Sequence, residues 1–264
     1  MISFLFISYN RSDLLAKALT TLHKAVLKAG LSAEFVVSDD ASTPEHQKVI
    51  NTLGFDTFSI ATVNSGLGAN QNRGLANCKG EFIFQLQDDW IFVGQPSYLT
   101  DAIEVLQSDP EVGIVQLTEV WSDLPTERRV TQGGVEYFVF RNDRLPWHRA
   151  CDRRPYSDWP HVKSVQFIKE IGSYLEGVRM SETENDFKRR VANQGHWRIA
   201  HISSWNSFVH IGVERSHNPG GKRNKFFAFL QKIPFLGKSV VPVMRLIWRK
   251  ADHLAAIIAS RLLC

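Results

Sequence analysis

The chain has 264 residues, of which 44% are hydrophobic and 22% charged, enough for one large α/β domain with its own core or for two small domains. With a formal net charge of +4, this composition is typical of a globular protein. The three cysteines, Cys78, Cys151 and Cys264, lie far apart and form no CxxC pair, which argues against a disulfide framework and against a zinc site. A reducing, cytosolic compartment fits this cysteine usage best.

Charge is distributed unevenly along the chain. Residues 222–264 contain nine Lys and Arg residues and one acid, so this tail has a net charge of +8. Because the whole chain has a net charge of +4, the remainder must carry −4. The acidic remainder argues against nucleic-acid binding, which needs a basic surface. The tail interleaves its basic residues with Phe, Leu, Ile and Val, and we expect it to bind an anionic membrane surface as an amphipathic segment. The alternative is a C-terminal helical hairpin that packs on the body.

The first 118 residues alternate between strand-like and helix-like segments. The N-terminal segment lacks a basic n-region and turns polar at Tyr9, so we interpret it as a first strand and expect no secretory signal. Apolar runs predict strands at 2–8, 33–40, 56–63, 81–87 and 111–120, and helical spacing predicts helices at 12–30, 43–54, 68–80 and 95–110. Strands that alternate with helices predict a mostly parallel sheet covered on both faces.

The pattern is less regular beyond about residue 121. Residues 141–161, rich in Arg, Trp and Pro, are expected to form a long functional loop. Helices are predicted at 162–177 and 182–195, followed by a strand at 196–202 and a turn segment at 208–222.

Polar residues follow three of the predicted strands. Residues 8–11 read Ser-Tyr-Asn-Arg, and the other two clusters contain the pairs Asp39-Asp40 and Asp88-Asp89. Ligands in such sheets bind beyond the carboxyl ends of the strands. Two adjacent carboxylates beside a buried strand need a cation or hydrogen-bond donors. Asp88 and Asp89 would suit a complex of Mn²⁺ or Mg²⁺ with a diphosphate, and the alternative is a capping or surface acidic pair.

The pair Asp39-Asp40 precedes a predicted helix. One such acid could accept hydrogen bonds from a base or ribose, or it could cap the helix that follows. The sequence has no G-x-G-x-x-G after its first strand and no G-x-x-x-x-G-K-[ST], so neither a classical dinucleotide site nor a P-loop is supported.

In combination, the segments FISYNR, VVSDDAS, NSGLGANQNRGLANCKGEFIFQLQDDW and ETENDFKRR resemble the inverting family 2 glycosyltransferases of GT-A fold, in the same order along residues 1–215. The resemblance implies the nucleotide-diphospho-sugar transferase fold, with a central mostly parallel sheet flanked by helices. It also implies a nucleotide-sugar-binding half at 1–118 and an acceptor-binding and catalytic-base half of the same domain at 119–221. Residues 222–264 would be a basic amphipathic tail.

The resemblance also implies roles for individual residues at the donor side. Asp40 would bind the base of the sugar nucleotide. The implied nucleotide-binding residues are Ser8, Asn10, Arg11, Asp39, Asp40, Asn64, Asn72 and Asp88. Asp89 would be the DxD-type metal ligand, although Leu86 stands where many members have the first acid of this motif. His210 occupies the place of a C-terminal metal or phosphate ligand, and a structural histidine after an apolar strand is the alternative.

Inversion needs a carboxylate that removes the proton from the acceptor hydroxyl. Residues Glu182, Glu184 and Asp186 are candidates, and alignment of TENDF with the Glu-Asp-x-Asp-Leu run of the family favours Glu184. The alternative is an acidic first helical turn stabilised by the helix dipole.

Further candidates lie in the two predicted loops. Trp147 and Trp159 could stack on an acceptor sugar or serve as packing residues. Arg215, Ser216 and His217 could cover the diphosphate or form a plain basic loop.

The expected activity is metal-assisted transfer of a sugar from a nucleotide diphosphate, most commonly UDP in this family, to a hydroxyl of a glycan or lipid-linked saccharide. The tail would hold the enzyme on the inner face of the cell membrane. A catalytically inactive membrane-docked scaffold is one alternative. The other is a sugar-phosphate nucleotidyltransferase, which commonly has a Gly-rich basic loop where this chain has SYNRSD.

Overall fold

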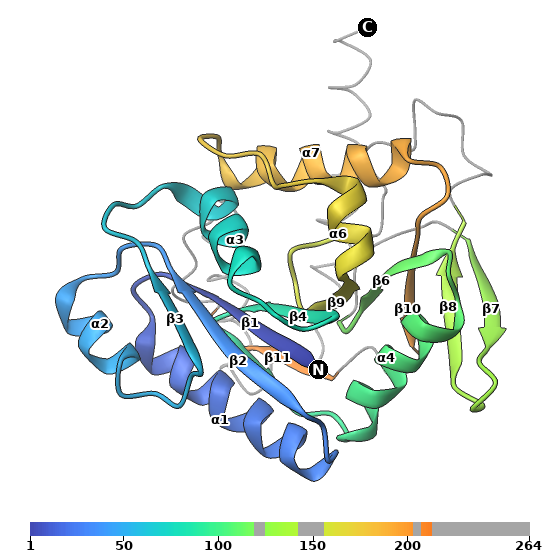
Figure 1. Cartoon of the computed structure of the whole chain (residues 1–264), viewed down its shortest axis with the longest axis horizontal. Helices are drawn as coiled ribbons and strands as arrows, with labels where there is room; N and C mark the ends of the chain where they lie inside the picture. The colour runs from blue at the N-terminus through green and yellow to red at the C-terminus, as the bar shows by residue number, and fades with distance from the viewer. Residues whose placement is uncertain (119–124, 142–155, 203–206, 213–264) are drawn as a thin grey trace, which may run out of the picture. The chain divides into compact units, whose positions relative to one another are not determined.

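A computed structural model describes residues 1–118, 125–141, 156–202 and 207–212 (Figure 1). The chain divides into two units, residues 1–211 and 212–264, and the elements below belong to the first. Its strands are β1 (Ile2–Ser8), β2 (Ala33–Asp39), β3 (Thr57–Ile60), β4 (Phe82–Gln87), β5 (Trp90–Phe92), β6 (Val112–Gln116), β7 (Thr126–Val130), β8 (Glu136–Phe140), β9 (His161–Ser164), β10 (Arg198–Ile202) and β11 (Phe208–His210). Its helices are α1 (Ser12–Lys28), α2 (Pro44–Ile50), α3 (Gly66–Ala76), α4 (Ser97–Ser108), α6 (Val165–Ile171) and α7 (Met180–Asn193).

Nine of these strands form one sheet in the order β3-β2-β1-β4-β9-β6-β10-β8-β7. The four strands from β3 to β4 are parallel, as the sequence predicts, and β6 pairs in parallel with β10. β9 lies antiparallel between β4 and β6, and β8 and β7 complete the sheet as an antiparallel pair. β5 and β11 form a separate two-stranded sheet.

Both faces of the sheet are covered, as Figure 1 shows, with α1, α2 and α4 on one side and α3, α6 and α7 on the other. The alternation of side chains along β1 produces this arrangement, because successive residues of a strand point to opposite faces. Phe4 and Phe6 belong to the apolar cluster that includes α1 and α4, whereas Leu5 and Ile7 pack with residues of α3 and α6. The first strand, in which all seven residues are buried, is therefore covered from both sides.

The second half departs from the sequence prediction at residues 162–177. A helix was expected there, but the segment begins within β9 and the helix α6 covers only Val165–Ile171. Val162 is fully buried in a strand paired on both sides, and Gly172 ends the helix at a φ of 84°, a conformation that favours glycine. The hairpin β7–β8 and the short strand β5 were not predicted either.

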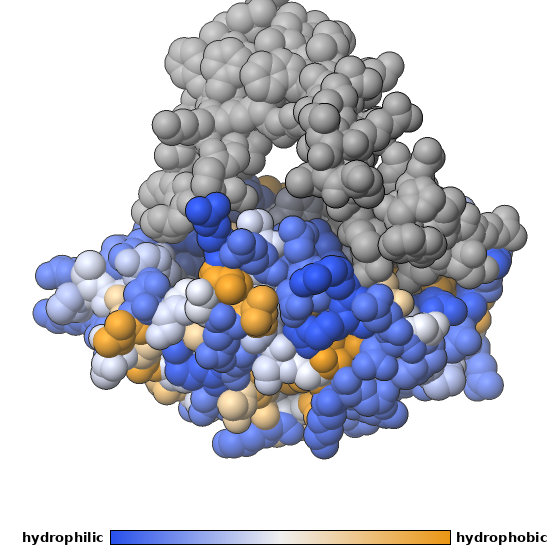
Figure 2. All heavy atoms as spheres, turned by 90° about the horizontal axis from the view of Figure 1, so that it is seen from above, coloured by the Kyte–Doolittle hydropathy of each residue, from blue (hydrophilic) through white to orange (hydrophobic). Residues whose placement is uncertain are grey.

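Hydrophilic residues predominate over the described part of the face in Figure 2, and the hydrophobic patches on it are small and separate. Within the described residues, every helix is too short or too polar to span a bilayer.

Candidate functional site

Three strand ends meet at one edge of the parallel part of the sheet. Ser8 pairs in register with Asp39, and Ile7 pairs with Gln87 on the other side. The chains remain in contact past the strands, because the amide of Asp40 donates to Ser8 O at 3.1 Å and that of Asp88 to Ile7 O at 3.0 Å. The polar clusters predicted after these three strands are thus brought together.

Asp88 is fully buried at this edge. One of its oxygens accepts hydrogen bonds from Ser8 Oγ and from the Tyr9 amide, both at 3.1 Å, and the other lies 2.9 Å from Arg11 Nη2. Burial raises the pKa of Asp88 to about 7, although the Arg11 charge acts in the opposite direction.

Asp89 is also buried, and its Oδ2 contacts Arg11 Nη1 at 2.5 Å and His210 Nε2 at 2.9 Å. Burial would raise the pKa of this carboxyl, but the hydrogen bond and charge of His210 together with Arg11 hold the pKa below its usual value. The positive group that the sequence required beside these aspartates is therefore Arg11, which bridges both. The place of Arg11 in the nucleotide pocket, which the family resemblance implies, stays a prediction.

The small sheet positions His210. β11 pairs with β5 so that His210 lies opposite Trp90, and the two rings stack with centroids 4.8 Å apart. The amide of Ile211 donates to Asp89 O at 2.8 Å. Trp159, whose side chain is 43% exposed, has its ring centroid 5.5 Å from that of Trp90. The rings of His210, Trp90 and Trp159 thus form an aromatic cluster beside the Asp89 carboxylate, and Trp159 is its exposed member.

The carboxylates of the second acidic pair, Asp39 and Asp40, accept hydrogen bonds from two different turns. Asp39 accepts from the amide of Ser42 at 2.9 Å and from its hydroxyl, and burial raises the pKa of Asp39. Asp40 accepts from the amides of Ser65 at 3.1 Å and Gly66 at 2.8 Å, so it caps α3 rather than the next helix in the sequence. Its charge is favourable at this helix N-terminus.

Asn10 has a φ of 53°, a left-handed conformation that asparagine tolerates better than most residues. Its amide donates to Ser42 Oγ at 2.7 Å, and its side-chain oxygen accepts from the Thr43 amide at 2.8 Å. The residue therefore links the end of β1 to the start of α2.

Two asparagines predicted at the nucleotide have different surroundings. Asn64 is exposed in the loop before α3. Asn72 faces the segment after α6: its amide nitrogen donates to Tyr174 O at 2.9 Å and to Glu176 Oε1 at 2.6 Å, and its oxygen accepts from the Tyr174 amide at 2.8 Å. Gly68 permits this approach, because a Cβ there would lie 2.1 Å from Leu175 O.

The three acids of α7 occupy distinct environments. Glu182 accepts from the Arg179 amide at 3.0 Å and so closes the helix N-terminus. Asp186 holds Arg190 at 2.8 Å. Glu184 pairs only loosely with Lys188 at 3.3 Å, and its side chain is 29% exposed. Of the three, Glu184 is the carboxylate not engaged by a turn or by an arginine in the described contacts.

A buried polar network near α7 was missed by sequence reasoning. Asp158, Tyr156, Tyr174 and Lys163 are all buried and joined by hydrogen bonds. The one available signal was Lys163 between two segments rich in apolar residues, because a lysine in a buried strand needs polar partners. Trp147, Arg215, Ser216 and His217 lie outside the described residues.

The acidic edge offers a partial set of ligands for a divalent cation. Among the described residues, no group of three or more His, Cys, Asp or Glu side chains is arranged to hold a metal. However, Asp89 Oδ1 is buried without a hydrogen-bond partner, and His210 adjoins the same carboxylate. These two ligands fit a cation that completes its shell with water and diphosphate oxygens, as Mg²⁺ usually does.

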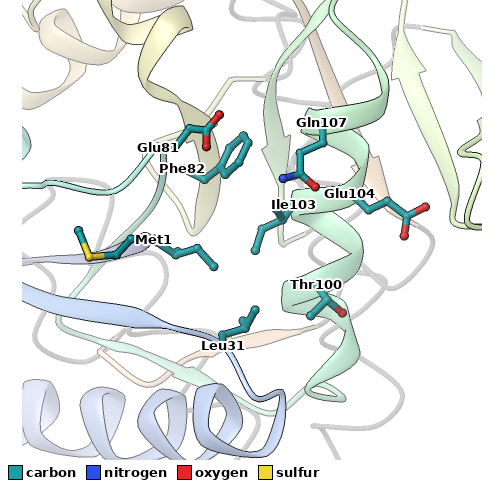
Figure 3. Close-up of a pocket in the computed structure, with 9 residues that line it drawn as sticks. Met1, Leu31, Glu81, Phe82, Thr100, Ile103, Glu104 and Gln107 are labelled. Atoms are coloured by element: carbon teal, nitrogen blue, oxygen red, sulfur yellow. The ribbon is translucent and has the colours of Figure 1, made fainter.

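A pocket at the opposite end of the strands contains none of the predicted site residues. Figure 3 shows it between the starts of β1 and β4 and helix α4. Its lining residues are Met1, Ile2, Leu31, Glu81, Phe82, Thr100, Ile103, Glu104 and Gln107.

The fold and the acidic edge define an α/β protein with its polar cluster at the carboxyl ends of parallel strands. The sequence model of glycosyl transferase family 2 matches residues 3–160, more than half of the chain, and the chain belongs to this family. None of the curated protein sequences matches it significantly.

Solved structures share the fold. TarS 1–349 from S. aureus superposes with a TM-score of 0.58 and 17% identity, covering 88% of this chain and 64% of that one. The same TarS fragment with UDP-GlcNAc gives 0.58 and 16%, covering 88% and 65%. The Pyrobaculum calidifontis mannosyltransferase PcManGT with GDP-Man and Mn²⁺ gives 0.52 and 16%, covering 75% and 53%. The chain spans less than two thirds of these neighbours, and the GT-A fold implied by the sequence is confirmed.

Proposed function

We propose that this protein is an inverting glycosyltransferase of the hexosyltransferase type, which uses a nucleotide-diphosphate sugar as its donor. The observation that carries the proposal is the convergence of two acidic pairs and His210 at the carboxyl edge of the parallel strands. This edge is where ligands bind in open α/β sheets. Membership of glycosyl transferase family 2 supports the same activity.

The donor occupies the edge formed by the ends of β1, β2 and β4. Asp40, whose amide is bonded to Ser8 O, receives the base. Asn10 and Arg11, which follow β1 and contact Thr43 and Asp88, line the same side. Ser8, Asp39, Asn64, Asn72 and Asp88 are the other nucleotide-side residues proposed from the family resemblance. UDP is the proposed nucleotide.

Asp89 and His210 would hold a Mn²⁺ or Mg²⁺ ion, which supplies charge neutralisation of the diphosphate when it is bound. Arg11, as a permanent cation at the same carboxylates, adds positive charge beside the leaving group. Glu184 removes the acceptor proton while the acceptor oxygen attacks the anomeric carbon. The bond to the diphosphate then breaks, and the anomeric configuration inverts.

The acceptor is a hydroxyl of a glycan or a lipid-linked saccharide. The exposed ring of Trp159 supports sugar stacking beside the acidic edge. Trp147 is proposed for the same role, with Glu182 and Asp186 near the base, and Arg215, Ser216 and His217 as a cover over the diphosphate.

The basic tail, residues 222–264, places the enzyme on the inner face of the cell membrane in this proposal. Its net charge of +8 against −4 for the rest of the chain supports attraction to anionic lipid. Flotation of the full chain with phosphatidylglycerol and with phosphatidylcholine vesicles tests it. Equal recovery with both lipids would contradict an electrostatic attachment, and a variant that lacks residues 225–264 should not float.

The activity is tested first by titration calorimetry of UDP, dTDP, GDP and CDP against the wild-type protein, each with and without Mn²⁺. Selective binding of one nucleotide, strengthened by Mn²⁺, is the expected result and names the donor class. Binding of none would favour an inactive scaffold.

A further inference from the structure

The small sheet of β5 and β11 has an apolar face that points away from the core. Successive residues of a strand point to opposite faces of a sheet. Trp90 and Phe92 of β5 and Phe208 of β11 are buried in the core. On the opposite side, Ile91 is half-buried, and Val93, directly after β5, is 53% exposed. Both sides of this small sheet are therefore apolar.

Strand β11 contributes to the same outer face. Val209 pairs in register with Ile91 and is 44% exposed. Directly paired residues of two strands point to the same side of the sheet. A sheet with one face in water usually has polar residues on that face. Adjoining apolar side chains at such a place are typical of a surface that contacts a partner.

Helix α1 places lysines beside this face. Thr21 Oγ1 accepts a hydrogen bond from the amide of Phe92 at 3.0 Å, so this side of α1 adjoins β5. Residues three and four apart lie on the same side of a helix. Lys17, Lys24 and Lys28 therefore share the side of Thr21, and all three are exposed.

The positive charge of these lysines is a local feature, because residues 1–221 have a net charge of −4. Asp13 is the only acid of α1, so the helix has one carboxylate for the three lysines. Within the part of the chain that the structure describes, none of the three lysines forms an ion pair. Binding to an anionic lipid surface increases with buried apolar area and with positive charge. An apolar face flanked by lysines has both properties.

The small sheet also borders the acidic edge. Trp90 directly follows Asp89, and His210 at the end of β11 lies 2.9 Å from the Asp89 carboxylate. The chain continues from β11 through residues 211–221 into the basic segment 222–264. A bilayer bound at the outer face of this sheet would therefore lie next to the proposed donor site.

We propose that this surface, termed the docking face, binds an anionic lipid bilayer. It consists of Ile91, Val93, Val209, Lys17, Lys24 and Lys28. The inference rests on the proposed function, because a lipid-linked acceptor would reach the acidic edge from this bilayer. The lysines attract the phosphate groups of the lipids, and the valines enter the interface between head groups and acyl chains. The docking face adds a contact made by folded residues to that of the basic segment, and so it determines how the acidic edge faces the membrane.

Vesicle binding of the full chain tests the charge of the docking face. Co-sedimentation with phosphatidylglycerol vesicles gives the partition coefficient. The double variant Lys17→Gln/Lys24→Gln should lower it about 25-fold, since each lysine near an anionic surface contributes about fivefold. Lys79→Gln/Lys169→Gln removes the same charge from exposed lysines outside α1 and should lower it less than about threefold. Equal losses would show that binding follows net charge alone and would overturn the inference.

The apolar part of the docking face is tested by one added charge. Val93→Glu should lower the partition coefficient about 10-fold, because its carboxylate would meet the anionic lipid. Val130→Glu is the matched control: Val130 lies on β7 at the far edge of the main sheet, is 52% exposed and gains the same charge. A loss of the same size in both variants would refute the docking face.

A second copy of the chain is the competing occupant of this face. Sedimentation velocity of the full chain without lipid tests it, and we expect Val93→Glu to leave the oligomeric state unchanged. A dimer that Val93→Glu dissociates and Val130→Glu does not would assign the face to a second copy and contradict lipid docking.

Nucleotide binding separates this inference from the proposed function. Lys17→Gln/Lys24→Gln and Val93→Glu should bind the selected nucleotide as the wild type does, because these residues lie outside the proposed donor and metal sites. If the wild type binds vesicles through the docking face but binds no nucleotide, the transferase proposal fails and lipid docking remains. If only deletion of residues 225–264 reduces vesicle binding and neither docking-face variant does, attachment by the basic segment remains and this inference fails.

Discussion

Arg11 and Asp89 form an ion pair at 2.5 Å although they lie 78 residues apart in the sequence. The same guanidinium reaches Asp88 at 2.9 Å, so one cation compensates two buried carboxylates. A planar guanidinium can bridge two carboxylates in this way, whereas the ammonium of a lysine cannot offer the same fork of donors. The acidic edge therefore depends for its charge balance on Arg11, the residue that immediately precedes α1.

Replacing Arg11 should destabilise the fold strongly. Arg11→Ala leaves two buried carboxylates without their cation, and loss of one partner of a buried pair costs about 3 to 5 kcal/mol of unfolding free energy. Urea unfolding at pH 7.5 measures this. Arg128→Ala is the control, because Arg128 pairs with Glu136 at the surface with 64% of its side chain exposed, and its loss should cost about 0 to 1 kcal/mol. Equal losses for the two variants would contradict the role given to Arg11.

Asp89→Ala should abolish the effect of Mn²⁺ on nucleotide binding. The variant removes the carboxylate that adjoins His210, and with it the buried oxygen that has no hydrogen-bond partner. Titration calorimetry with the nucleotide that the wild type selects, with and without Mn²⁺, is the measurement. Asp101→Ala, on the half-buried surface of α4, is the control and should keep the Mn²⁺ effect. Unchanged Mn²⁺ dependence in Asp89→Ala would refute the metal assignment.

Asn72→Ala should destabilise the protein, since Asn72 makes three hydrogen bonds to Tyr174 and Glu176. We expect a loss of about 1 to 3 kcal/mol, in part because the buried backbone groups of Tyr174 lose their partners. Asn64→Ala is matched in chemistry but exposed, and it should change stability by less than about 0.5 kcal/mol. Thermal unfolding of both variants measures these changes in stability. Because unfolding is measured without nucleotide, the difference reports the contribution of Asn72 to stability and is independent of any loss of nucleotide affinity.

His201 should make the protein less stable in mild acid. Burial lowers the pKa of His201 to about 4 from its usual 6.5. Between these values the unfolded chain binds a proton that the native state does not, so stability falls as the pH drops from about 6.5 to about 4, by up to about 3 kcal/mol. His201→Phe keeps a ring against Phe138 and should reduce this slope in urea unfolding at pH 7, 5.5 and 4.5. Part of the slope should remain, because burial also holds the pKa of His161 well below its usual value. The exposed His196→Phe should retain it; identical slopes in wild type and His201→Phe would refute the assignment.

Sequence periodicity predicted the first half of the fold well, because β1 and β4 are short, mostly apolar runs that are followed by polar clusters. It could not show that β9 inserts antiparallel between β4 and β6, since four residues with a buried lysine carry little periodic signal. The acidic pairs were found, but their partners were not. Arg11 and the amide of Gly66 reach the acids from 78 and 26 residues away, and such pairing is set by the packed fold.

Glu184→Gln should keep donor binding and lose transfer by orders of magnitude, because the amide keeps the shape of the side chain but cannot accept the acceptor proton. Glu182 and Asp186 are engaged by Arg179 and Arg190, so Glu182→Gln and Asp186→Asn should affect stability more than the chemical step. Single-turnover assays with a bound sugar nucleotide separate binding from chemistry. Retained turnover in Glu184→Gln, with loss in either of the other two, would transfer the role of the base to that residue.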